Sequence, residues 1–368
     1  MKSTNRRQFL LTTGAAAAGL STLPLFAADE KKQTQESIKA FCIDFNWDQG
    51  FAAPGKWADA DPKEHIQWYK ELGCNTVQTF CVSCNGYAWY KGGVVPEQPG
   101  LKHDFLTEMV SLGHKEKMKV FGYFCAGANT RWGKEHPDES YGVPASRHIP
   151  LTNRYLDDLA AVIEESLKRT GIDGFMVDWL FNPPKNHWLQ CEQQMYVELM
   201  EEPFPGADQV TSEQTLACRR KALDRCWKRI YETARSVNPK ALIWLTCYDL
   251  QHPEIAGSPM IRQADWLMNE AGDIETLKKT AAQAGKQTRL LTCLASWNRQ
   301  DPMKTILDAA GSGLDIGFYG FAKPTQGSLL PPISSYLAKP VDSFAGDNKN
   351  IAMFARVFNN LPPDDVQK

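Results

Sequence analysis

Short apolar runs alternate with amphipathic runs from residue 38 onward, and this alternation constrains the fold more than any other feature. The amphipathic runs carry apolar residues at helical spacing, and several open on Asp-Pro or Thr start signals. The apolar runs predict buried strands at residues 40–45, 76–82, 120–126, 174–178, 241–247, 265–269, 289–294 and 315–321. Strands that alternate with helices favour a parallel sheet. Eight such units predict a single (β/α)8 TIM barrel over residues 38–368.

The first 28 residues are typical of an export signal rather than of the fold. Arg6 and Arg7 resemble the pair of a twin-arginine signal, an Ala- and Gly-rich apolar run follows at residues 10–20, and Ala27-Ala28 ends the segment. The apolar run is short for a membrane span, so we expect removal of residues 1–28, with an uncleaved anchor as the alternative. The predicted location is the periplasm or the cell exterior, without membrane contact afterwards.

Composition excludes several partners. The 368 residues carry a formal net charge of −2 and no basic block, which argues against nucleic acid. Five of the ten cysteines lie in predicted strands, where Cys behaves as a buried hydrophobe, so we expect mostly free thiols, with a disulfide formed after export as the alternative. No phosphate loop, serine elbow or histidine metal motif occurs, so we expect no cofactor and no metal. A metal at Asp44, Asp178 and Glu270 is the weaker alternative.

Carboxylates, amides and aromatics gather where the predicted strands end. Asp178 ends the strand at 174–178, and a charge there needs a partner or a role, because such strands are buried on both faces. The structural alternatives are a cap of the next loop or a pair with an Arg for Asp178, and a helix cap for Glu270. Sugars need aromatic faces and fixed polar groups. We therefore expect substrate contacts from Asp44, Asn46, Trp47, Trp89, Asn129, Arg131, Trp179, Asp249, Trp297 and Tyr319.

The run Gly171-Ile-Asp-Gly-Phe-Met-Val-Asp178 resembles the nucleophile strand of the α-L-fucosidases of glycoside hydrolase family 29 and of related hypothetical glycosidase families. The resemblance implies Asp178 as nucleophile. Glu270 matches the strand-six carboxylate of the hypothetical families, which implies an acid/base role, with Asp249 as its rival. Asn46-Trp47 stands where the fucosidases have a His-Trp pair, so the sugar is open.

Together these features predict a glycoside hydrolase of α-L-fucosidase-like or α-galactosidase-like type that acts on a carbohydrate substrate. Retention is the expected stereochemistry. The sequence does not fix the distance between the two carboxyl groups, so inversion stays open. The alternative function is a non-catalytic carbohydrate-binding barrel. It is disfavoured because both candidate carboxylates are present, where a binding protein would tolerate Asn or Ser.

Overall fold

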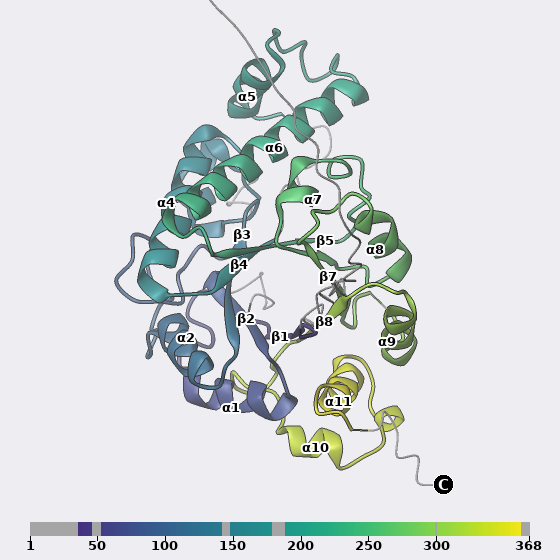
Figure 1. Cartoon of the computed structure of the whole chain (residues 1–368). Helices are drawn as coiled ribbons and strands as arrows, with labels where there is room; N and C mark the ends of the chain where they lie inside the picture. Colours follow the sequence, from purple (N-terminus) through teal and green to yellow (C-terminus); the bar gives the residue numbers. More distant parts are fainter. Residues whose placement is uncertain (1–35, 46–52, 142–147, 179–187, 299, 362–368) are drawn as a thin grey trace, which may run out of the picture. The chain divides into compact units, whose positions relative to one another are not determined.

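The computed structural model describes residues 36–45, 53–141, 148–178, 188–298 and 300–361. Within the unit Ser37–Lys368, parallel strands pair in chain order, and β8 pairs with β1 to close the barrel (Figure 1). The predicted (β/α)8 barrel is therefore confirmed. The strands are β1 Lys39–Ile43, β2 Thr76–Val82, β3 Lys119–Cys125, β4 Gly174–Asp178, β5 Leu242–Cys247, β6 Trp266–Asn269, β7 Arg289–Leu294 and β8 Ile316–Ala322.

The helices lie around the outside of the barrel (Figure 1). Their bounds are α1 Pro62–Leu72, α2 Phe105–Lys115, α3 Thr130–Glu135, α4 Asn153–Thr170, α5 Gln190–Met200, α6 Ser212–Val237, α7 Pro259–Gln263, α8 Ile274–Ala281, α9 Pro302–Gly311, α10 Ile333–Leu337 and α11 Asp347–Phe358, with single 3-10 turns at Pro137–Glu139 and Val341–Ser343. Asp61, Thr211 and Asp301 cap α1, α6 and α9 with their side chains. The start signals in the sequence therefore mark real helix starts.

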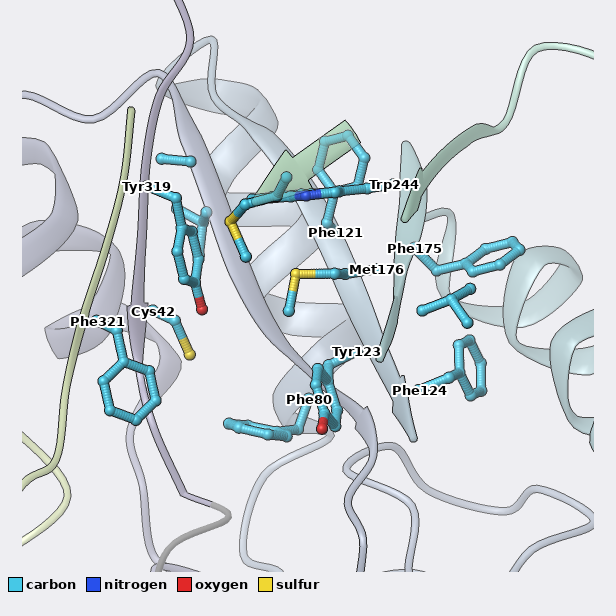
Figure 2. Close-up of a cluster of buried hydrophobic side chains, with 14 of the residues drawn as sticks. Cys42, Phe80, Phe121, Tyr123, Phe124, Phe175, Met176, Trp244, Tyr319 and Phe321 are labelled. Carbon is cyan, nitrogen blue, oxygen red and sulfur yellow. The ribbon is translucent and has the colours of Figure 1, made fainter. Parts of the chain in front are cut away.

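The strand register determines which side chains fill the barrel. Met176 pairs with Trp244, and Trp244 pairs with Trp266, so all three project to the same side. The Trp244 ring packs 5.4 Å from Trp266 and 5.3 Å from Tyr319, centroid to centroid. Figure 2 shows Met176, Trp244 and Tyr319 in this interior cluster, whereas Phe175 lies on the opposite side of its strand. Large side chains therefore fill the interior of the barrel below the carboxyl ends of the strands, as in other (β/α)8 barrels.

The close approach of β4 and β5 depends on Gly174. A Cβ atom at this position would lie 2.0 Å from the carbonyl oxygen of Leu242, so a larger residue would push the strands apart. Only glycine, which has no side chain, fits at this position. Gly174 thereby lets β4 sit in register and carry Asp178 to the barrel mouth.

All ten cysteines are free thiols, and nine of them are buried, which confirms the expectation drawn from their apolar surroundings. Burial raises the pKa of most of these thiols, so they stay protonated and unreactive. In the part of the chain that the structure describes, no helix is both long and apolar enough to cross a membrane.

Candidate active site

Three carboxylates lie at the carboxyl ends of strands, in positions whose side chains face the interior of the barrel. Asp44 stands two residues after Cys42, Asp178 two after Met176 and Glu270 two after Met268, so each continues its strand's interior face. Asp178 and Glu270 also act on a common neighbour, because burial and the negative charges of Glu270 and then Asp178 raise the pKa of Cys247. Asp178 and Glu270 thus both lie at the carboxyl end of the barrel, where (β/α)8 enzymes place their chemistry.

Asp178 is held by a neutral partner. The Tyr123 hydroxyl donates a hydrogen bond of 2.8 Å to Asp178 Oδ2, across from β3 to β4. Burial and then the charge of Asp178 raise the pKa of Tyr123, so this hydroxyl keeps its proton and remains a donor. Asp178 is only half-buried. One carboxylate oxygen is therefore fixed by a group that does not cancel its charge, which suits a nucleophile.

Glu270 has the environment of a proton donor. Burial raises the pKa of its carboxyl group, although a 3.0 Å hydrogen bond from Thr246 Oγ1 to Glu270 Oε1 acts in the opposite direction. A general acid must carry its proton before the bond breaks, and a raised pKa provides this. The backbone is fixed as well, because Glu270 N donates to Cys247 O at 2.9 Å and Asn298 Nδ2 donates to Glu270 O at 3.1 Å.

The alternative in which Glu270 caps the following helix is wrong. Asp273 is the N-cap of α8, and its Oδ1 accepts from Thr276 N at 2.7 Å. Glu270 lies three residues before that cap and directs its carboxylate toward Thr246 on β5. The sequence could not separate these two acids, because both stand in the same short segment after β6. The structure assigns capping to Asp273 and leaves Glu270 for another role.

The spacing of the two carboxyl groups follows from the strand geometry. Asp178 and Glu270 stand on β4 and β6, two strands apart and offset by two residues along the barrel. With strands about 4.8 Å apart and a rise of about 3.3 Å per residue, their Cα atoms are at most roughly 12 Å apart. Side chains that converge in the mouth shorten this distance. The spacings that retaining and inverting glycosidases use, roughly 5 Å and 6.5–9.5 Å, both lie within reach.

Asp249 and Trp297 lie at the rim, where the sequence predicts them. Asp249 is exposed, and its Oδ1 accepts from Gln251 N at 2.8 Å in the turn after β5. Trp297 is 38% exposed and packs edge-on against Phe321, with ring centroids 4.2 Å apart. Asp44 lies deeper: it is buried, and its backbone N donates to Ala322 O at 2.9 Å. Asp249 thus serves the turn, while Trp297 offers a ring to solvent.

Two aromatic residues predicted to bind substrate belong to the core instead. Trp89 is buried, its Nε1 donates to Ser83 Oγ at 2.6 Å, and its ring packs 4.8 Å from Phe45. Tyr319 is buried inside the barrel, where its hydroxyl donates to Gln78 Oε1 at 2.8 Å. Neither ring has a face to offer a ligand. Their predicted binding roles are therefore wrong, because tertiary packing turns both side chains inward.

Asn129 and Arg131 make contacts that stabilise the loops after β2 and β3. Asn129 is the N-cap of α3, and its Oδ1 accepts from Trp132 N at 2.9 Å. Arg131 donates from Nε to Gly86 O at 2.9 Å and forms an ion pair of 2.5 Å with Glu135. These contacts join the loops after β2 and β3. The contacts described for Asn129 and Arg131 are therefore structural, and their predicted contacts with substrate stay predictions.

Three further predicted site residues, Asn46, Trp47 and Trp179, lie outside the described residues. The sequence reasoning missed Tyr123 and Thr246, which hold the two carboxylates. A signal for both exists, since each lies on the interior face of its strand near the carboxyl end. Among the described residues no group of three His, Cys, Asp or Glu side chains could hold a metal ion.

Residues 61–179 match the family model of hypothetical glycosyl hydrolase 6. The matched segment runs from α1 to the end of β4 and contains both Tyr123 and Asp178, whereas Thr246 and Glu270 lie beyond it. The likeness to a glycosyl hydrolase family therefore covers the half of the site that carries the candidate nucleophile. No curated protein sequence matches the chain.

Solved structures share the barrel. An α-L-fucosidase, isoenzyme 2 from Paenibacillus thiaminolyticus, superimposes with a TM-score of 0.61 at 13% identity over 88% of this chain and 49% of its own. The β-galactosidase from Bacillus circulans sp. alkalophilus has a TM-score of 0.59 at 13% identity, over 90% of this chain and 57% of its own. The PgaB (BpsB) glycoside hydrolase domain from Bordetella bronchiseptica has a TM-score of 0.55 at 10% identity, over 77% of this chain and 93% of its own. The chain thus spans about half the length of the fucosidase. At these identities the likeness shows the fold alone.

Proposed function

We propose that this chain is an exported glycoside hydrolase in which Asp178 is the nucleophile and Glu270 is the acid/base. The observation that carries the proposal is the pair of carboxyl groups at the ends of β4 and β6, each held by a hydroxyl from a neighbouring strand. Burial raises the pKa of the Glu270 carboxyl group, as a proton donor requires. Two carboxyl groups in different environments are what hydrolysis of a glycosidic bond requires.

The proposed reaction proceeds in two displacements. Asp178 attacks the anomeric carbon while Glu270 gives its proton to the glycosidic oxygen, so the bond to the leaving group breaks as the bond to Asp178 forms. Glu270, now ionised, then removes a proton from water. The resulting hydroxide displaces Asp178 from the anomeric carbon, which releases the sugar with retained configuration and restores both carboxyl groups. Product analysis by proton NMR distinguishes this course from inversion.

The sugar and the location are parts of the same proposal. The strand-four motif and the fucosidase and galactosidase barrels of similar fold support a fucose or galactose glycoside as the first substrate class to test. Arg6 and Arg7, followed by the apolar run at residues 10–20, support export through the twin-arginine route to the periplasm or beyond. A formal net charge of −2 fits a glycan better than a polyanion such as nucleic acid.

The test is a panel of aryl glycosides and glycosyl fluorides of fucose, galactose, glucose and arabinose. Asp178→Asn is expected to lower kcat about 10³-fold or more, because the variant lacks the attacking group. Glu270→Ala is expected to impair poor leaving groups most, and azide should rescue it by forming a glycosyl azide. Asp249→Asn is the matched control at the neighbouring strand end. Near wild-type turnover by Asp178→Asn, or no turnover of any glycoside by the wild type, would overturn the proposal.

A further inference from the structure

The described part of the barrel exposes two large aromatic side chains, Tyr248 and Trp297. Tyr248 is 62% exposed and directly follows β5, and Trp297 is 38% exposed and stands three residues after β7. The strand between them, β6, ends one residue before Glu270. The two exposed rings therefore stand on either side of the candidate proton donor, at the functional end of the barrel.

The strand register places Tyr248 beside Glu270. Trp244 pairs with Trp266, Thr246 pairs with Met268, and the last pair is Cys247 with Asn269, so Tyr248 and Glu270 each stand one residue past the end of their strands. The two segments stay side by side there, because Glu270 N donates to Cys247 O at 2.9 Å and Ala271 N donates to Tyr248 O at 3.1 Å. Paired strands lie about 4.8 Å apart, so the tyrosine ring emerges next to the Glu270 side chain.

Trp297 stands on the β7 side of Glu270, and contacts of its ring and of the adjacent residue hold it there. Its ring contacts Phe321 edge-on at a centroid distance of 4.2 Å and an interplanar angle of 79°. Phe321 belongs to the cluster of buried side chains near the end of β8 (Figure 2). The adjacent Asn298 donates to both Cys293 O at 2.7 Å and Glu270 O at 3.1 Å. The backbone that carries Trp297 is therefore tied to the backbone that carries Glu270.

We infer that Tyr248 and Trp297 form the subsite for the leaving group and that the leaving group is a second sugar ring. This inference rests on the proposed hydrolase function. A general acid protonates the oxygen of the leaving group, so rings that flank Glu270 face that side of the scissile bond. A pyranose presents apolar C–H faces that stack on aromatic rings. The preferred substrate is thus a sugar–sugar linkage rather than a glycoside of a small alcohol.

The experiment compares two substrates that differ only in the leaving group. For the sugar whose fluoride the wild type hydrolyses, kcat/KM is measured on its methyl glycoside and on its disaccharide with glucose. Both leaving groups need a proton from Glu270, but only glucose can stack. Tyr248→Ala and Trp297→Ala should each lower the disaccharide-to-methyl ratio about threefold to tenfold. Tyr248→Phe keeps the ring and should restore the ratio, and Leu307→Ala, an exposed residue on α9, is the matched control.

The outcomes separate the inference from the proposed function. A ratio that is the same in wild type, Tyr248→Ala and Trp297→Ala overturns the subsite while hydrolysis of the fluoride still upholds the hydrolase. If the wild type hydrolyses no fluoride, the proposed hydrolase fails, and glycan-array binding decides the subsite. Glycan binding by the wild type that Tyr248→Ala loses supports the aromatic subsite, whereas equal binding by both overturns it.

Discussion

Removal of the Thr246 hydroxyl should move the pH range in which Glu270 is active. In the folded protein, Thr246 Oγ1 donates to Glu270 Oε1 at 3.0 Å, and this hydrogen bond lowers a pKa that burial raises. Thr246 is buried, so water does not replace the lost donor, and valine has nearly the same shape. In Thr246→Val only burial acts, and the pKa of Glu270 should rise further.

The size of this change follows from the strength of the lost bond. A hydrogen bond to a charged group contributes about 1.5–3 kcal/mol, and one to the neutral acid about 0.5–1.5 kcal/mol. The ionised form therefore loses about 1 kcal/mol more than the protonated form. Since 1.36 kcal/mol corresponds to one pH unit, the alkaline midpoint of the kcat/KM profile should move up by roughly 0.5 to 1 unit. The variant thus keeps its activity to a higher pH.

The assay records kcat/KM against pH for the glycoside identified in the substrate panel, because this profile reports the essential acid of the free enzyme. Carbon-13 NMR of labelled glutamate gives the same titration without turnover. Thr170→Val, which removes a buried hydroxyl from α4 far from the barrel mouth, is the matched control. An alkaline midpoint that stays in place or moves down in Thr246→Val would show that Glu270 is not the group that limits activity at high pH.

Three further predictions concern the scaffold. Tyr319→Phe should lower the free energy of unfolding by about 1–3 kcal/mol, because it leaves Gln78 Oε1 without its 2.8 Å donor. If Tyr319 is a core residue, kcat/KM should stay within about twofold of the wild-type value. Urea unfolding measures the first change, and enzyme kinetics measure the second. Gly174→Ala should lower the melting temperature sharply or prevent folding, because its Cβ would lie 2.0 Å from Leu242 O, and a normal melting curve would contradict this. Burial raises the pKa of Glu192 to about 7, above its unfolded value. The stability that protonated Glu192 contributes is therefore complete below about pH 4.5 and is lost as pH rises through 7. Urea unfolding at pH 5 and pH 8 should show a larger loss of unfolding free energy in wild type than in Glu192→Gln, by roughly 3 kcal/mol at most.

The sequence predicts the barrel well, because each strand is a buried apolar run and several helices, among them α1, α4, α6 and α9, open on a residue whose side chain caps them. The strand Gly174–Asp178 has the predicted bounds. The loops are harder. Trp89 and Trp297 both lie in loops that follow strands, yet Trp89 packs against Phe45 whereas Trp297 stays at the rim. That difference depends on contacts between distant segments, which local pattern does not encode.

Register explains why the sequence misses the residues that complete the site. Thr246 on β5 and Tyr248 just after it continue the alternation that starts at Trp244, but their relation to Glu270 depends on how far β6 is shifted against β5. A shift of one residue would turn both side chains away from the barrel mouth. The pairing of Cys247 with Asn269 fixes the shift, so that Thr246 bonds to the carboxyl group and Tyr248 stands beside it. In the proposed enzyme, β5 therefore supplies the hydroxyl that binds the acid, and the residue that follows β5 lines the proposed leaving-group subsite.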